Sequence, residues 1–127
     1  MSVTATPHLP HRPSLHERLC AAIEARHVLY FCYKDGELRV IEPHCYWETA
    51  FGALLLRAWQ RSGFSESGEP TGWKTFRVDR LLAFESTSQR FEGPHEGYVP
   101  FGSISASRYF AFVPPEVPEW IEAPSVL

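Results

Sequence analysis

Residues 27–45 place the strongest constraint on the fold of this 127-residue chain. Two runs rich in aromatic and β-branched residues, 28–33 and 38–41, flank the tetrapeptide Lys34-Asp-Gly-Glu37. An Asp-Gly pair between two such runs is typical of the tight turn of a β-hairpin. A similar strand pattern returns in residues 74–87. The sequence therefore predicts an antiparallel hairpin in the first half of a β-rich chain.

The residues before this hairpin predict one helix. Ser14 and Glu17 have the spacing of an N-terminal capping box, in which the serine hydroxyl accepts from a backbone amide of the first turn. Apolar residues then recur every three or four positions, as at Leu19 and Ile23, and form a single apolar stripe. We expect this helix to end near His27, where β-branched and aromatic residues begin.

Further strands are predicted after the hairpin. Residues 45–49 and 53–60 each predict a strand, and residues 61–72, rich in Gly, Ser and Glu, predict an exposed loop. Residues 73–78 and 80–87 predict one long bent strand or two short ones, and residues 104–113 add a last element whose type the pattern leaves open. One helix followed by short, closely spaced strands predicts a mainly-β fold, a small, strongly bent antiparallel sheet or barrel.

The chain has the length of a single domain with two extensions. Residues 1–13 hold three prolines and predict a flexible or extended arm, and residues 14–113 predict the domain with its leading helix. Residues 114–127 predict a proline-rich tail. Its Trp120 either covers a face of the domain or docks into another chain, and we expect the first.

The charge balance argues against a protein that coats nucleic acid without regard to sequence, because such a protein needs a broad basic face. The formal net charge is −3 and the pI is about 6.0. A local basic pocket remains compatible with this balance. Three widely spaced cysteines offer neither a CxxC pair nor a disulfide framework, which fits a reducing compartment. Without an apolar leader or spanning segment, the chain is predicted to be soluble and cytoplasmic, with no membrane partner.

Four arginines lie among apolar residues in the predicted strands: Arg39, Arg57, Arg77 and Arg80. A guanidinium group is costly to bury and needs an anionic partner. Its planar set of donors suits phosphate or carboxylate, so one reading is a ligand pocket. The other reading is a set of internal ion pairs, with Arg77 or Arg80 bound to Asp79 or Glu42.

Two further residues, His44 and Tyr33, extend the candidate site. His44 follows Pro43, which restricts the local chain, and its imidazole either donates to an anion or caps a turn. Tyr33 and Trp59 either stack on a base or belong to the core, and we favour the core. The predicted ligand-binding residues are Tyr33, Arg39, His44, Arg57, Arg77 and Arg80.

The order of four segments resembles that of the WYL domain, an Sm-like, SH3-type β-barrel of bacterial regulators. The resemblance covers residues 19–91. It is carried by the segments AIEARHVLYFCY, DGELRVIEPHC, GALLLRAW and KTFRVDRLLAFEST. It implies an SH3-like or Sm-like barrel with a regulatory, ligand-sensing role. It also implies that positive residues bind nucleic acid or nucleotide-like ligands.

Two departures from the family narrow what the resemblance implies. The Trp-Tyr-Leu triplet of the family aligns with Ala53-Leu54-Leu55 here, so two of its three residues differ. Family members typically carry an N-terminal helix-turn-helix domain, whereas one short arm and one helix precede the barrel here. We therefore do not expect DNA readout by a recognition helix.

Catalysis and metal binding have little support in the sequence. The paired spacing of structural zinc ligands is absent among Cys20, Cys32, His44 and Cys45. The sequence also contains no nucleophile elbow, phosphate-binding loop or paired-carboxylate motif. We therefore expect no cofactor and no metal, and we predict a non-catalytic domain that binds a nucleotide or single-stranded nucleic acid. The alternative is a protein-interaction or self-association module whose arginines are purely structural.

Overall fold

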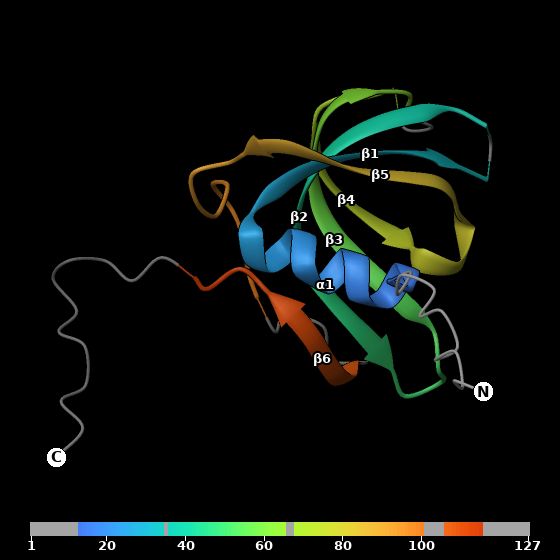
Figure 1. Cartoon of the computed structure of the whole chain (residues 1–127), viewed down its shortest axis with the longest axis vertical. Helices are drawn as coiled ribbons and strands as arrows, with labels where there is room; N and C mark the ends of the chain where they lie inside the picture. Colours follow the sequence, from blue (N-terminus) through green and yellow to red (C-terminus); the bar gives the residue numbers. More distant parts are fainter. Residues whose placement is uncertain (1–12, 35, 66–67, 101–105, 116–127) are drawn as a thin grey trace, which may run out of the picture.

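The predicted mainly-β fold with one leading helix is confirmed. The computed structural model describes residues 13–34, 36–65, 68–100 and 106–115. One helix precedes a single, strongly curved antiparallel sheet of six strands (Figure 1). In chain order the elements are α1 (Leu15–Ala25), β1 (His27–Tyr33), β2 (Leu38–Thr49), β3 (Leu54–Gly63), β4 (Gly72–Arg77), the short 3-10 helix η1 (Val78–Arg80), β5 (Leu81–Arg90) and β6 (Ala106–Phe112).

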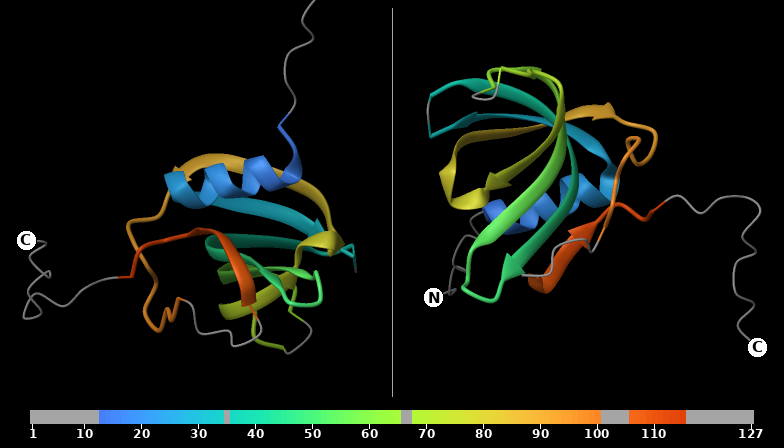
Figure 2. Two further views of the ribbon diagram at one scale, coloured as in Figure 1. Left: turned by 90° about the horizontal axis from the view of Figure 1, so that it is seen from below. Right: turned by 180° about the vertical axis from the view of Figure 1, so that it is seen from behind.

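The helix begins as predicted and ends slightly earlier. Ser14 caps it, and the serine hydroxyl accepts a hydrogen bond of 3.1 Å from the backbone N–H of Glu17. Its end is set by Arg26, which adopts the left-handed conformation with φ of 58° and turns the chain directly into β1. The helix buries Leu19 and Ile23. It runs across one side of the curved sheet, in contact with β1, β2, β5 and β6 (Figure 2).

Strand β2 is the centre of the sheet. It pairs with β3 along one edge, while its other edge pairs first with β1 and then with β6. The prediction of two separate strands, 38–41 and 45–49, is therefore wrong, because they form one continuous strand. Pro43 stands where the neighbour on one edge changes from β1 to β6 and where the β3 register shifts. A residue without an N–H is tolerated at such an irregularity.

The segment from residue 73 to residue 87 forms two strands. β4 pairs with β3, β5 pairs with β1, and the 3-10 turn η1 changes the chain direction between them. The sheet order is β4-β3-β2-β1-β5, with β6 on β2, so β4 and β5 are its two ends. The described strands thus form a strongly bent open sheet, and a closed barrel is not confirmed.

Two strands end later than the sequence predicts. β3 continues to Gly63, three residues beyond the predicted end, and β5 continues to Arg90. The last element, whose type the sequence left open, is the strand β6. Each strand continues past the local turn signals because a neighbouring strand extends the ladder, as β2 does for Gly63.

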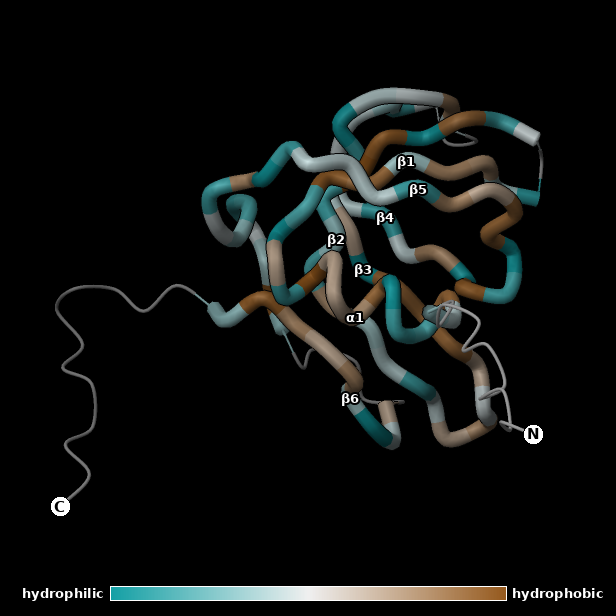
Figure 3. Tube along the Cα trace, viewed as in Figure 1, coloured by the Kyte–Doolittle hydropathy of each residue, from teal (hydrophilic) through white to brown (hydrophobic). Residues whose placement is uncertain are grey.

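The core lies between the helix and the inner side of the sheet. Its largest fully buried aromatic side chains are Phe31 and Tyr46, and Leu56, Ile41 and Val113 pack around them. Figure 3 shows hydrophilic stretches mainly in the loops, such as the loop after β5. Within the described residues, no helix has the length and apolar character that crossing a membrane requires.

Both predicted extensions fall largely outside the described residues. These are residues 1–12 of the arm and residues 116–127 of the tail, which include Trp120. The arm and the tail therefore stay predictions.

We predict that Gly63→Ala destabilises the protein more than Gly72→Ala. Both glycines have positive φ, 112° and 131°, so alanine costs about 1–3 kcal/mol of backbone strain at either position. A Cβ at Gly63 would also lie 2.4 Å from the carbonyl oxygen of Leu38 and 2.8 Å from Cα of Arg39, whereas a Cβ at Gly72 has nothing within 4 Å. Such overpacking adds about 1–3 kcal/mol.

Urea unfolding followed by tryptophan fluorescence measures both variants. Equal losses of unfolding free energy would show that the close approach of β2 and β3 at this point does not matter.

Candidate functional site

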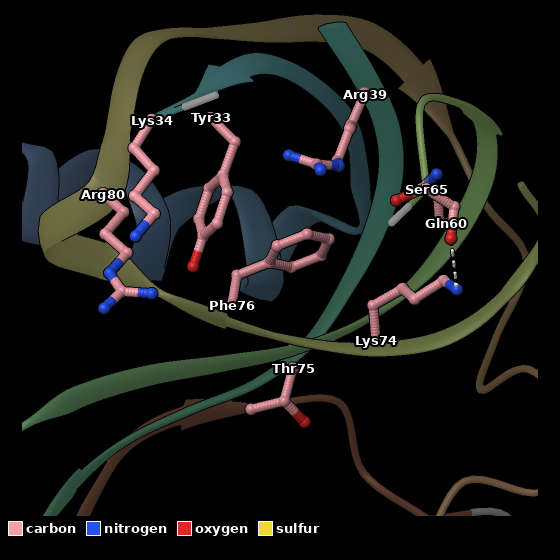
Figure 4. A pocket seen from close by; sticks show the side chains of 9 residues that line it. All are labelled: Tyr33, Lys34, Arg39, Gln60, Ser65, Lys74, Thr75, Phe76 and Arg80. Atoms are coloured by element: carbon pink, nitrogen blue, oxygen red, sulfur yellow. Dashed lines mark hydrogen bonds between the residues drawn. The ribbon is translucent and has the colours of Figure 1, made fainter. Parts of the chain in front are cut away.

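A cavity of about 380 Å³ opens on the inner side of the curved sheet. This volume lies within the range of small-molecule sites. Figure 4 shows Tyr33, Arg39 and Phe76 projecting into the space that the strands surround, whereas Thr75 points away from it. The described lining residues are Tyr33, Lys34, Arg39, Gln60, Ser65, Lys74, Thr75, Phe76 and Arg80. We call this cavity the cationic pocket.

The cationic pocket is basic and partly aromatic. Four of its nine described lining residues are basic, Lys34, Arg39, Lys74 and Arg80, and none of the nine is acidic. They come from four places in the chain: the turn after β1, β2, β4 and η1. The sheet therefore gathers charges that are dispersed in the sequence. An anion placed between these four side chains would be attracted by each of them.

Arg39 is the most buried of the four. Its side chain is held in an aromatic surround, with the guanidinium carbon 4.9 Å from the ring centre of Tyr33, 5.6 Å from that of Phe64 and 5.8 Å from that of Phe76. The residue is 4% exposed, and its Nε donates to the carbonyl oxygen of Phe64 at 3.0 Å. Cation–π attraction of this kind offsets part of the cost of removing the guanidinium from water.

Aromatic contacts also fix the wall between the basic residues. The rings of Tyr33 and Phe76 lie 5.5 Å apart in an edge-to-face arrangement, and Phe31 packs against both from the core. The Tyr33 hydroxyl accepts a hydrogen bond of 3.0 Å from the backbone N–H of Arg77. Tyr33 therefore connects β1 to the end of β4 through this hydrogen bond. Its ring packs against the core and also lines the pocket.

The loop between β3 and β4, described at residues 64, 65 and 68–71, contributes Ser65 to the cationic pocket and is called the β3–β4 loop. Gln60 is fully buried, and its Nε2 donates to the carbonyl oxygens of Phe64 at 2.9 Å and Pro70 at 3.0 Å. Lys74 Nζ donates to Ser65 Oγ at 3.1 Å and to the carbonyl oxygen of Glu69 at 2.9 Å. The pocket side chains thus hold the loop by its oxygen atoms.

Three of the six predicted site residues come together in the cationic pocket: Tyr33, Arg39 and Arg80. Alternation along β3 and β4 explains why Arg57 and Arg77 do not. The inward-facing positions of β3 are Leu56, Ala58 and Gln60, which leaves Arg57 on the outer side.

Arg57 and Arg77 have partners within the protein. Arg57 donates to Thr75 Oγ1 at 3.0 Å and lies over the ring of Trp73, and burial lowers its pKa from the ordinary value. Arg77 makes a two-point contact with Asp79, at 3.2 Å and 3.1 Å. These hydrogen bonds lower the pKa of Asp79. The predicted internal ion pair between Arg77 and Asp79 is therefore confirmed.

His44 is fully buried on the outer side of β2 and does not line the cationic pocket. Its Nδ1 lies 2.8 Å from the carbonyl oxygen of Glu42, and its Nε2 lies 2.9 Å from the backbone N–H of His95. The carbonyl only accepts and the amide only donates, so the ring is neutral with its proton on Nδ1. Burial lowers the pKa of His44 to about 4. His44 therefore anchors the loop after β5 to the sheet.

Trp59 lies on the same outer side and also contacts that loop. Its ring stacks on His95 with centroids 3.7 Å apart and planes 14° apart, and it meets Trp73 edge to face. The sequence left base stacking and core packing open for Trp59. The structure places this ring in a second aromatic cluster, apart from the cationic pocket.

The pocket contains basic and polar residues that the sequence prediction missed. Lys74 and Phe76 are two apart on β4 and share its inner side, so strand alternation could have linked Lys74 to the pocket. Lys34 sits in the hairpin turn and Gln60 at the end of an apolar run. Their local sequence gives no sign of the cavity, because only the bend of the sheet brings them together.

A second cavity, of about 400 Å³, lies beside the loop after β5. Its charges are compensated, because the Glu42 carboxylate contacts Arg61 Nε at 2.6 Å and His95 Nδ1 at 3.2 Å. Glu92 and Glu96 also line it. This cavity is therefore less suited to an anion than the cationic pocket.

The described residues contain no group of three or more His, Cys, Asp and Glu side chains placed to hold a metal ion. His16 Nε2 lies 3.9 Å from Cys20 Sγ, the one Cys–His contact recorded among them. Burial, and next the charge of Glu24, raises the pKa of the Cys20 thiol. A raised thiol pKa disfavours the thiolate that a nucleophile needs.

Comparison of this chain with protein-family models, curated proteins and solved structures gives no match. The resemblance to the WYL domain therefore stays a prediction from the residues that carry it.

We predict that the stability of the protein falls as the pH is lowered from about 6.5 to about 4. The folded state holds His44 neutral, so the unfolded chain binds the additional proton in this range. The contribution of His44 to the free energy of unfolding is complete above the ordinary pKa of 6.5. It is lost as the pH falls towards the pKa of about 4 that His44 has in the folded state. At about 1.4 kcal/mol per pKa unit, it amounts to about 3 kcal/mol.

Urea unfolding across this pH range tests the prediction, with His44→Phe as the comparison. The variant is expected to be less stable at neutral pH and to show a shallower decline. An unchanged slope in the variant would assign the decline to other groups.

Proposed function

We propose that this domain binds a small phosphorylated ligand, a nucleotide or the end of a single-stranded nucleic acid, in the cationic pocket. The observation that carries the proposal is the convergence of Lys34, Arg39, Lys74 and Arg80 on one cavity whose described lining holds no carboxylate. Hydrogen bonds from such cations to phosphate oxygens are among the strongest in proteins. No group in the pocket is assigned a catalytic role, so the proposed activity is binding.

The electrostatics of the chain favour a local site over an extended interface. The net charge of −3 makes the molecule as a whole repel a polyanion. The basic residues of the pocket act over a short range, because the Debye length at physiological salt is about 8 Å. The pocket therefore suits a compact anion, whose phosphates fit within the cavity, better than a long strand.

The aromatic lining suits a ligand with a planar group. Phe64 is 42% exposed beside Arg39, and Tyr33 and Phe76 line the wall. Stacking of a base on such a ring contributes about 1–3 kcal/mol. A nucleotide combines this planar group with phosphate, which is why it is preferred here to inorganic anions.

The alternative function, a protein-interaction or self-association module, stays a prediction. Its premise that the arginines are structural holds for Arg57 and Arg77, which bind Thr75 and Asp79. Arg39 and Arg80 line the cationic pocket instead.

We predict that Arg80→Ala and Lys34→Ala each weaken ligand binding at least about tenfold, the loss expected for one charge-assisted hydrogen bond. Arg77→Ala is the matched control, because Arg77 is three positions from Arg80 and pairs with Asp79. It should change binding by less than about twofold, because Arg77 lies outside the described pocket lining.

Two assays at low salt separate the two ligand classes. Calorimetry measures nucleoside mono-, di- and triphosphates, and fluorescence polarisation measures a 5′-phosphorylated oligonucleotide. Absence of binding in both, or equal losses for Arg80→Ala and Arg77→Ala, would refute the proposed function. Self-association without ligand binding, measured by sedimentation, would favour the alternative.

A further inference from the structure

Gln60 places a buried, unsatisfied hydrogen-bond acceptor at the wall of the cationic pocket. The residue is 0% exposed on β3 and belongs to the pocket lining. Its Oε1 atom has no hydrogen-bond partner among the described residues. Most buried polar side-chain atoms in proteins have a partner, so an atom without one at the wall of a cavity indicates a partner that the cavity receives.

The neighbouring backbone fixes which way the amide of Gln60 is turned. Its Nε2 donates to the carbonyl oxygen of Phe64 at 2.9 Å and to that of Pro70 at 3.0 Å. Carbonyl oxygens only accept, so the opposite orientation would lose both hydrogen bonds and set Oε1 against two other acceptors. Oε1 is therefore held in place as an acceptor, and only a donor satisfies it.

Gln60 lies across the pocket from two of its basic residues. Figure 4 shows Lys34 and Arg80 on one side of the pocket and Gln60 on the other, with the rings of Tyr33 and Phe76 between them. A nucleotide whose phosphate contacts Lys34 and Arg80 extends past these rings towards Gln60. The part of the ligand that meets the amide is then its base.

We infer that Oε1 of Gln60 accepts a hydrogen bond from an exocyclic amino group of the bound base. Adenine, cytosine and guanine carry such a group, and glutamine recognises the amino group of adenine in the same way in DNA complexes. Oε1 is enclosed in the empty pocket, so this donor reaches it from the side of the cavity that Gln60 lines.

The hydrogen bond makes the pocket selective among ligands of similar shape. A site with a buried polar group rejects an analogue that leaves this group unpaired. The cationic residues bind the phosphate of any nucleotide, whereas Gln60 distinguishes bases that carry an amino group from those that lack one. This inference rests on the proposed function, because it requires a nucleotide in the cationic pocket, and it adds the class of base.

Calorimetry with ATP and with the 5′-triphosphate of purine riboside tests the inference on the unaltered protein. The two ligands differ only in the amino group at C6. ATP should bind about tenfold more tightly, the effect of one hydrogen bond to a buried group. The 2′-deoxy form of ATP should bind as ATP does, because the ribose hydroxyl is not the inferred donor. Equal affinities for ATP and the purine analogue, or a loss with the 2′-deoxy form instead, would overturn the inference.

Gln60→Met removes both amide atoms at similar side-chain length. The variant loses the hydrogen bonds to Phe64 and Pro70, so its affinity for both ligands can fall, but ATP and the purine analogue should then bind equally. Gln89→Met, at an exposed position of β5, is the matched control and should keep the preference for ATP. A preference that persists in Gln60→Met would assign it to another group and overturn the inference.

The outcomes keep the inference and the proposed function apart. If ATP and the purine analogue bind equally well, the inference fails and the proposed function stands. If a 5′-phosphorylated oligonucleotide binds and ATP does not, the same comparison is made with adenine and with purine as its 5′ base. If neither ATP nor the oligonucleotide binds, both fail.

Discussion

The long strand β2 carries the hydrogen-bond ladders of three neighbours, β3 on one edge and β1 followed by β6 on the other. The same edge of β2 pairs with β1 near Arg39 and with β6 from Cys45 onwards, and the sheet is strongly bent. Pro43 marks the change of partner, and the next residue, His44, uses both ring nitrogens to fasten the strand to its own backbone and to the loop after β5. The core, the second aromatic cluster around Trp59 and the cationic pocket all depend on this strand.

Basic residues lie on both sides of the sheet. On the outer side, cations meet partners of the same chain, as Arg61 meets Glu42 and Arg77 meets Asp79. On the inner side, Arg39 is buried among aromatic rings and shares a cavity with three other basic residues. Burial of a charge is costly unless other groups compensate it, and the aromatic rings and the carbonyl oxygen of Phe64 do so in part for Arg39. The proposed ligand site lies on this inner side of the sheet.

Local signals in the sequence predicted most of the elements. The Ser14 cap, the Asp-Gly turn and the alternation of apolar residues depend on neighbours a few positions away, and each gave the correct element type. The errors lie where distant partners decide. β2 continues through Pro43 because β3 pairs with it on both sides of the proline, and β3 extends to Gly63 because β2 is long enough to meet it. The site was half predicted for the same reason: Arg39 and Arg80 were recognised as costly charges, and Lys34 carries no local sign of the cavity. Lys74 was missed, although strand alternation places it on the same side of β4 as Phe76.

The sequence by itself determined the class of fold, a helix followed by an antiparallel β-sheet, and it marked arginines among the apolar residues of the strands. Both follow from short-range chemistry, namely side-chain periodicity, turn residues and the cost of burying charge. Only the tertiary structure decided which cations share a cavity. The side of the sheet on which a residue lies depends on strand register, and a shift of one position would exchange Gln60 for Trp59 or Arg61 at the pocket. Register is set by pairing between residues far apart in the chain, and no local pattern encodes it.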